Sequence, residues 1–417
     1  MIKRIPISLL TILLTVQAIF GAIPADEQLS SQDRVFMATQ IYSDINIYFA
    51  DFKDDPGLNL DNEYKLYLKA ILVSDSRKDF DLATMAFIAK LGNGHTWFGD
   101  WWLRKDRGQQ LGFYAHPIDN EWVITESSIE SVKPGDVIAR IDNEEITEFY
   151  QKNKQYLFAS DERWRMRALF ESPFLFPQTF QMSMKDGKQV QITRTLPFAF
   201  HGDEYKENSV SKIGDSLYIR IPSFSNSVFE SSAINEIKSM GKVKALILDL
   251  RGNHGGQTIG NLVQALMDKS YRPWSESTSV SIGLFRSWGM LNQQSTMTVF
   301  GGTQSPRKPI YTGPLYILVD DGCYSACEDT VQPFKDNHRA IIVGERTAGS
   351  SGTQYIRDFG NGMAMGLVTR RKSFPNGAQF EGIGIAPDIE VHRTQSDIAS
   401  GRDPVLAKVL EMVSKPE

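Results

Sequence analysis

The spacing of apolar residues changes character twice along the chain. In residues 23–107, apolar residues recur at helical intervals, as at Met85, Ile88 and Ala89. This pattern predicts an N-terminal helical domain. Residues 108–200 contain short apolar runs separated by turn residues, which is typical of β-strands. The sequence therefore predicts a helical region followed by a β-rich one.

Strands and helices alternate over residues 201–395. The strands are near-continuous apolar runs, such as residues 243–250 and 315–319, which is typical of buried strands. Such alternation predicts an α/β layered domain. Within it, residues 274–303 are polar and poor in periodicity, and we expect a flap over a cleft. In the C-terminal segment, residues 396–417, the stretch from Asp403 to Ser414 carries apolar side chains on one face, which predicts a closing helix.

Residues 1–22 have the features of a signal peptide. Lys3 and Arg4 precede an apolar stretch that ends at Phe20, and small residues follow it. We therefore expect an exported protein, periplasmic or secreted, with no stable membrane span after the signal is removed. The alternative is an uncleaved segment that anchors the protein, although the stretch is shorter than the ~20 residues that a spanning helix needs.

Composition and charge narrow the classes of partner. The chain has 417 residues, of which 41% are hydrophobic, and a formal net charge of −5. It has enough apolar material for two or three domains and no basic footprint that would suit nucleic acid. Its histidines and cysteines lack zinc-type spacing. We expect neither a nucleic-acid partner nor a metal.

Ser325 is the most informative single residue. A predicted strand at residues 315–319 leads through the turn residues 320–322 to a helix that begins at Ser325. A hydroxyl in that position meets backbone N–H groups and the positive end of a helix, so Ser325 is a candidate nucleophile. However, Ser325 and Glu328 also match a capping box, in which both side chains satisfy N–H groups at the helix start. This segment alone leaves both interpretations open.

A glycine-rich turn follows the other apolar strand. Residues 243–250 lead into RGNHGG at residues 251–256. Glycines there let the backbone approach a ligand closely and present N–H groups, as an oxyanion hole requires. The alternative is an ordinary connection from a strand to a helix.

Five segments, in this order, resemble the tail-specific, or C-terminal-processing, serine peptidases, to which the tricorn core protease is related. They are IRIPSF at residues 219–224, DLRGNHGG at 249–256, YSACE at 324–328, VGERTAG at 343–349 and GIGIAPD at 382–388. The resemblance extends from about Ile41 to His392. It implies a ββα peptidase core of the Clp protease and crotonase type, a serine peptidase without metal or organic cofactor, and a peptide or unfolded protein as substrate.

The resemblance also suggests which residue assists Ser325. In the better-known branch of the family a lysine would fall at Ser350, and this chain lacks it, although Gln354 matches the surrounding loop. The tricorn-like branch uses a histidine, which His95 matches, so His95 is the candidate general base. An unperturbed imidazole titrates near neutral pH, so we expect activity to rise at about pH 6–7.

A carboxylate of the tricorn-like branch falls at Glu381, and the resemblance gives it the role of orienting His95. That branch has a serine just before its histidine, where this chain has Gly94. We therefore expect Thr96 or a water to complete the connection. Glu345 is a competing carboxylate, which we expect to be structural.

Further contacts are also implied by the resemblance. It points to the N–H groups of Gly255 and Ala326 as the oxyanion donors. Gly256 and Gln354 are expected to contact the substrate.

VKPGDVI at residues 132–138 resembles the signature turn of PDZ domains. Leu111, Gly112 and Phe113 then match the loop whose N–H groups receive a peptide C-terminus, and we expect them to bind substrate. Residues 148–174 form an insertion where a compact PDZ domain has a short helix. This region is expected either to bind peptide tails or to serve as a scaffold.

The two cysteines, Cys323 and Cys327, flank Ser325 symmetrically. A bridge between them would constrain the nucleophile turn, so we expect two buried thiols that pack as small apolar groups. The alternative is a disulfide that acts as a redox latch on the site.

Taken together, the residues and the resemblance predict an exported serine endopeptidase that forms an acyl-enzyme on Ser325, with His95 as base. One alternative is a catalytically inactive protein that binds peptides on the same fold, suggested by Ser350 and Gly94. Another is a hydrolase of non-peptide esters or amides. The expected domains are a signal peptide at 1–22, a helical domain at 23–107, a PDZ-like domain at 108–200, a peptidase core at 201–395 and a C-terminal helix at 396–417.

Overall fold

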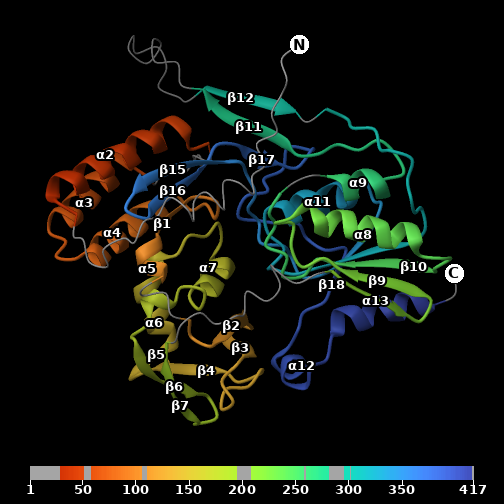
Figure 1. Ribbon diagram of the computed structural model, residues 1–417, viewed down its shortest axis with the longest axis horizontal. Helices are drawn as coiled ribbons and strands as arrows, with labels where there is room; N and C mark the ends of the chain where they lie inside the picture. Colours follow the sequence, from red (N-terminus) through yellow and green to blue (C-terminus); the bar gives the residue numbers. More distant parts are fainter. Residues whose placement is uncertain are drawn as a thin grey trace.

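The computed structural model describes residues 29–50, 58–105, 110–194, 208–257, 260–280, 295–300 and 302–415. The predicted signal peptide lies outside these ranges. Figure 1 shows three groups of elements, with α-helices at one end, a small β-rich region below them and a larger sheet with helices on both faces at the other end. In the part of the chain that is described, we find no helix long and apolar enough to cross a membrane.

Three helices form the first group, each begun by a polar residue whose side chain accepts a hydrogen bond from the backbone. They are α2 (Ser31–Tyr48), α3 (Leu60–Leu72) and α4 (Arg77–Ala89), with Ser30, Asn59 and Ser76 as their N-caps. Their apolar faces share one core with a sheet of three strands, in the order β1 (Trp97–Asp100), β16 (Met363–Val368) and β15 (Gln354–Gly360). Strands from the C-terminal part of the chain thus complete the core of the N-terminal helices.

The β-rich middle region has its own apolar core. It contains β2 (Phe113–Ile118), β3 (Glu121–Ser127), β4 (Ile138–Ile141), β5 (Glu144–Glu145), α6 (Ile146–Asn153), η1 (Lys154–Tyr156), α7 (Glu162–Ala168), η2 (Pro173–Leu175), β6 (Thr179–Met184) and β7 (Gln189–Thr193). Strands β2 and β3 pair as a hairpin, and the other strands form a sheet in the order β5-β4-β6-β7. Helix α7 contacts β2, so the insertion at residues 148–174 packs against the first strand of the region.

A sheet of six strands organises the largest group. Its order is β18-β14-β13-β10-β9-β8, and all neighbours are parallel except β8 and β9. The strands are β8 (Ser209–Ile213), β9 (Ser216–Arg220), β10 (Ala245–Asp249), β13 (Leu315–Val319), β14 (Ile341–Gly344) and β18 (Ile389–Glu390). The predicted buried strands at residues 243–250 and 315–319 are therefore confirmed as β10 and β13.

Side chains that alternate along β10 explain why both faces of this sheet are covered. Leu246 and Leu248 pack in the core with α8 (Ser227–Ser239), α9 (Asn261–Leu266) and α11 (Ala326–Asp336). Ala245 and Ile247 face the opposite core, which contains α13 (Pro404–Ser414). Helix α12 (Gln395–Ser400) precedes α13. The predicted α/β layering and the closing helix are confirmed.

A small sheet formed by β12, β11 and β17 lies beside these groups (Figure 1). β11 (Ser275–Val280) and β12 (Ser295–Phe300) are antiparallel, and β11 also pairs with β17 (Arg371–Ser373). The part of residues 274–303 that the structure describes is thus mostly strand, although the sequence there shows little periodicity.

Candidate active site

Ser325 lies where β13 passes through a turn into α11. Its backbone has φ of 58° and ψ of −121°, a conformation that non-glycine residues rarely adopt and that costs about 1–3 kcal/mol. Its side chain makes no capping hydrogen bond; instead, Ser325 Oγ lies 2.9 Å from His95 Nε2. The capping-box interpretation of Ser325 and Glu328 is therefore wrong, because the backbone turns the hydroxyl away from the helix and toward the imidazole.

A disulfide spans this nucleophile turn. Cys323 and Cys327 are bonded to each other, with their Cα atoms 5.4 Å apart, and both are buried. The expectation of two buried thiols is wrong, because the turn at Ser325 brings the two side chains within bonding distance, which their spacing in sequence could not reveal.

His95 lies between α4 and β1, where several contacts fix its ring and backbone. Its Nδ1 lies 2.8 Å from both Ser350 Oγ and Tyr324 Oη, and the Tyr324 ring stacks on the imidazole with centroids 4.5 Å apart. Its carbonyl accepts a 2.6 Å hydrogen bond from Gln354 Nε2. For Nε2 to accept the Ser325 proton, Nδ1 must carry the ring hydrogen, and two hydroxyl oxygens are in position to receive it.

The pKa of His95 is lowered to about 3, chiefly because the ring is buried and secondly because Lys372 is positively charged, while Asp329 acts in the opposite direction. The expectation of titration at about pH 6–7 is therefore wrong for the free protein. Burial keeps the imidazole neutral, and so able to accept a proton, throughout the neutral range.

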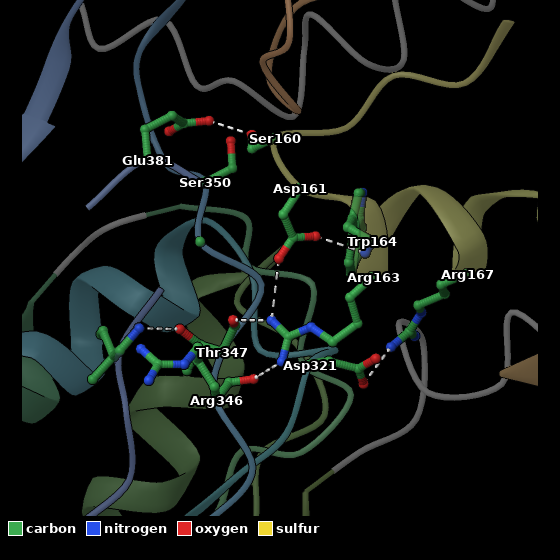
Figure 2. A network of polar contacts seen from close by, with 12 residues as sticks. Ser160, Asp161, Arg163, Trp164, Arg167, Asp321, Arg346, Thr347, Ser350 and Glu381 are labelled. Atoms are coloured by element: carbon green, nitrogen blue, oxygen red, sulfur yellow. Dashed lines mark hydrogen bonds and ion pairs between the residues drawn. The ribbon is translucent and has the colours of Figure 1, made fainter. Parts of the chain in front are cut away.

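Glu381 supports the main chain around His95. Its Oε1 accepts a 3.0 Å hydrogen bond from Asn93 Nδ2, while Asn93 Oδ1 accepts one of 2.9 Å from the backbone N–H of His95. Ser160 Oγ donates to the same carboxylate, and Figure 2 shows Ser160 pointing at Glu381 with Ser350 beside the pair. The expected connection through Thr96 is not made, because Thr96 Oγ1 instead accepts a hydrogen bond from the backbone N–H of Val368.

Gly94 occupies the place where the tricorn pattern has a serine. A β-carbon added there would lie 3.1 Å from Tyr324 Oη, 3.2 Å from Ser350 Oγ and 3.3 Å from Ser160 Oγ. Three hydroxyls from elsewhere in the chain therefore surround the position, and a side chain on residue 94 would require them to shift by a few tenths of an ångström.

Gly255 approaches the nucleophile turn very closely. With φ of 86°, it could carry a side chain only if the β-carbon lay 2.6 Å from Ala326 N and 2.7 Å from Ser325 Cβ, which is closer than real β-carbons come. Its N–H donates a 2.9 Å hydrogen bond to Asn253 Oδ1. Ala326 is the first residue of α11, where backbone N–H groups favour negative charge. Gly255 thus packs closely against the start of α11 at Ala326, while its own N–H is engaged by Asn253.

The remaining predicted residues lie in varied surroundings. Gly256 has φ of 135° and bridges to Phe224. Glu345 Oε1 accepts a 3.1 Å hydrogen bond from the N–H of Arg393, and burial raises its pKa.

The three residues expected to form a carboxylate-binding loop belong to the middle region. Leu111 and Phe113 are buried in the core of that region, and the Gly112 carbonyl accepts hydrogen bonds from Ser128 N and Ser128 Oγ.

Glu328 is a site residue whose surroundings the sequence did not reveal. Fully buried, it accepts hydrogen bonds from Thr347 Oγ1 at 2.5 Å, Gly349 N at 2.8 Å and Ser350 N at 3.0 Å. Burial raises its pKa to about 8, although these three donors oppose the shift. Glu328 thus holds the loop that brings Ser350 to His95. Its only signal in the sequence was its place in YSACE, where it resembled a cap.

A buried ion pair lies behind the same loop. Lys372 Nζ is 2.6 Å from Asp329 Oδ1 and 3.0 Å from Ser351 Oγ, and Trp274 Nε1 donates to Asp329 at 2.7 Å. Lys372 belongs to β17, Asp329 to α11, Ser351 to the loop, and Trp274 immediately precedes β11, so no local pattern could have joined them. Among the residues that the structure describes, no cluster of histidine, cysteine or carboxylate side chains is arranged to hold a metal ion.

Comparison with known proteins gives consistent matches. Residues 215–391 match the sequence model of peptidase family S41. The chain is 30% identical over 205 residues to the carboxy-terminal-processing protease of Bartonella bacilliformis, covering 47% of this chain and 43% of the relative. It is 28% identical over 197 residues to the carboxyl-terminal-processing protease of Synechocystis sp., covering 46% and 42%. The chain thus spans less than half the length of these curated relatives.

Solved structures share the fold over most of the chain. Mature CPAF complexed with lactacystin aligns with a TM-score of 0.70 at 15% identity, covering 92% of this chain and 97% of that one. The photosystem II D1 C-terminal processing protease aligns with a TM-score of 0.52 at 19% identity, covering 87% and 94%. At these identities the likeness concerns the fold alone.

In sequence, residues 215–391 are thus similar to peptidase family S41, and under half of the chain is similar to carboxyl-terminal-processing proteases.

Proposed function

We propose that the protein is a serine endopeptidase that cleaves peptides or unfolded proteins through an acyl-enzyme on Ser325. The observation that carries the proposal is the 2.9 Å contact between Ser325 Oγ and His95 Nε2, with the other ring nitrogen, Nδ1, contacted by Ser350 Oγ and Tyr324 Oη. A nucleophile, a base and a group that orients the base are the parts that serine acyl transfer requires.

Acylation begins when Ser325 Oγ attacks the scissile carbonyl carbon while its proton moves to His95 Nε2. The resulting tetrahedral intermediate collapses as the C–N bond breaks and His95 returns the proton to the leaving amine. A water then attacks the ester with His95 again acting as base, and this releases the new carboxylate and restores Ser325. Each step balances without a cofactor.

The oxyanion of the intermediate is assigned to the N–H groups of Ala326 and Gly255. The start of α11 favours negative charge there, and the missing side chain of Gly255 leaves space beside Ser325. Because Gly255 N donates to Asn253 in the free protein, this role requires the N–H to be shared with or released to the substrate. Glu381 has the role of supporting His95 through Asn93.

The finer organisation is part of the proposal. Residues 201–395 are interpreted as a ββα core of the Clp protease and crotonase type, residues 23–107 as a helical domain, and residues 108–200 as a PDZ-like domain. Gly256 and Gln354 are assigned to substrate contact near Ser325, and Leu111, Gly112 and Phe113 to contact with a peptide tail. Export to the periplasm or outside the cell follows from the composition of residues 1–22.

The test is hydrolysis of an unstructured protein, followed by mass spectrometry of the fragments. The parent protein is compared with Ser325→Ala, His95→Ala and a control, Ser231→Ala, which removes an exposed hydroxyl on α8 that bonds only within its helix turn. We expect cleavage by the parent and the control, and none by Ser325→Ala or His95→Ala. Saturable peptide binding without cleavage by any of the four proteins would instead identify an inactive peptide-binding protein. Turnover of small esters alone would identify a non-peptide hydrolase.

A further inference from the structure

Residues 160–167 of the middle region reach several parts of the site at once. They comprise Ser160, Asp161 and the helix α7, and they fall within the insertion at residues 148–174. Figure 2 shows their side chains pointing toward Glu381, the loop at Arg346 and Thr347, and Asp321 of the nucleophile turn. Neither sequence nor resemblance gave this segment a role in the site.

Ser160 connects the backbone beside His95 to Glu381. Its Oγ accepts a 2.8 Å hydrogen bond from the N–H of Gly94 and donates to Glu381 Oε1. Together with Asn93, it fixes the main chain on both sides of residue 94.

Trp164 extends the aromatic stack that holds the imidazole. Its ring lies parallel to that of Tyr324, with centroids 4.9 Å apart and planes inclined by 5°, and Tyr324 in turn stacks on His95. The backbone N–H of Trp164 donates 2.7 Å to Asp161 Oδ1, which caps α7. Trp164 therefore covers the side of Tyr324 that faces away from His95.

Two arginines of α7 anchor the segment to the turns around Ser325. Arg163 donates to the carbonyls of Arg346 at 2.9 Å and Thr347 at 2.7 Å. Arg167 is buried and lies 3.2 Å from Asp321 Oδ1 and 3.0 Å from His254 Nε2, so it links the nucleophile turn to the glycine turn. Both arginines make directional contacts to fixed acceptors, which limits how far α7 can move.

We infer that residues 160–167 are a positioning element for His95, with Trp164 holding the ring through Tyr324 and Ser160 holding the main chain at Gly94. The inference rests on the proposed function, in which His95 is the base. The segment contacts Tyr324, Glu381 and the turns around the site, so it is expected to act on the rate through the orientation and burial of the imidazole. A region predicted either to bind peptide tails or to serve as a scaffold thereby supplies part of the support of the active site.

The orientation of His95 depends on charged and titratable groups from several elements. Tyr324 faces it from the nucleophile turn, Lys372 from β17 and Asp329 from α11, and Glu381 acts through Asn93. Replacing Trp164 changes none of these charges. It opens the outer side of Tyr324 to water, so the pKa of His95 should move up toward its ordinary value.

The experiment compares Trp164→Ala, Trp164→Phe and Ser160→Ala in the full chain. The matched control is Arg165→Ala, because Arg165 lies on the same helix and pairs with Glu162. We expect Trp164→Ala to lower kcat about two- to tenfold, the range that corresponds to one lost aromatic contact, with KM little changed. The acid limb of the kcat profile should move to higher pH. Trp164→Phe should retain most of the parent's kcat and most of the parent's pH profile. Ser160→Ala, which leaves the Gly94 N–H and the buried Glu381 carboxylate without this partner, should lower kcat about tenfold or more.

A second readout does not depend on activity. The ¹⁵N resonances of the His95 ring, assigned by comparison with His95→Ala, report its titration directly. A higher pKa of His95 in Trp164→Ala than in the parent and in Arg165→Ala supports the inference, even if the parent shows no peptidase activity and the proposed function fails. The inference is overturned if the His95 titration is the same in Trp164→Ala and the parent. Equal losses of activity and melting temperature in Trp164→Ala and Arg165→Ala, with an unchanged pH profile, would also overturn it.

Discussion

The chemistry of the site depends on how one imidazole is surrounded. His95 is only 6% exposed, contacts hydroxyls at both ring nitrogens and lies near the positive charge of Lys372. The folded protein thus gives His95 a lower pKa than the same residue has in the unfolded chain, so protonation favours the unfolded state. Stability is therefore expected to fall as pH decreases from about 6.5, the usual pKa of histidine, toward about 3.

Lys372→Met tests the electrostatic part of this environment. The positive charge of Lys372 lowers the pKa of His95, whereas the negative charge of Asp329 raises it. Removing Lys372 also leaves Asp329 without its ion-pair partner, so both effects raise the pKa of His95. We expect the acid limb of kcat/KM, well below pH 6.5 in the parent, to move to higher pH in Lys372→Met. Lys372→Arg keeps the charge and is the control. An acid limb that does not differ between the two variants would show that Lys372 has no influence on His95.

The identities of Ser325, His95 and Glu381 could be suggested from the sequence because each lies in or near a recognisable motif. Their connections could not be predicted. Ser160 and Ser350 are ordinary serines in loops, and they meet Gly94 only because three distant segments fold together. The pKa of His95 was misjudged for the same reason, since burial is a property of the assembled structure.

At the scale of elements, the turn between β13 and α11 determines where the nucleophile points. Ser325, with its positive φ, lies within the loop that the disulfide between Cys323 and Cys327 closes. The same turn is held by Ala348 N, which donates to the Cys323 carbonyl at 3.0 Å. The strand, the turn and the helix were all predictable from apolar runs and glycine. The bond was not, because whether the two thiols meet depends on the backbone conformation at Ser325.

Replacing both cysteines by alanine tests the role of this bond. A disulfide that closes so short a loop contributes about 2 kcal/mol by restricting the unfolded chain, so we expect a loss of this size in the free energy of unfolding. Because the turn at Ser325 is held less firmly, kcat should also fall. Reductant should lower the stability of the parent and have no further effect on the double variant. Equal kcat in the two proteins would mean that the bond does not hold the nucleophile.

At the scale of the whole molecule, the site lies where three regions meet. His95 follows the N-terminal helices, Ser160 and Trp164 come from the middle region, and Ser325 belongs to the six-stranded sheet and its helices. The alternation of apolar runs was sufficient to predict the layered α/β part. It could not predict that β15 and β16 complete the core of the N-terminal helices, because strand pairing over such separations has no local pattern.

The central claim is that Ser325, activated by His95, is the nucleophile. The most direct test is to treat the full chain with a fluorophosphonate, a reagent that bonds covalently to activated serine nucleophiles as fluoride leaves. The adduct is then located by peptide mass spectrometry. We expect one adduct on Ser325, its formation slowed at least about a hundredfold in His95→Ala, since general-base catalysis contributes about 10²–10⁴-fold. An adduct on another residue, or labelling of Ser325 at the same rate without His95, would contradict the assignment.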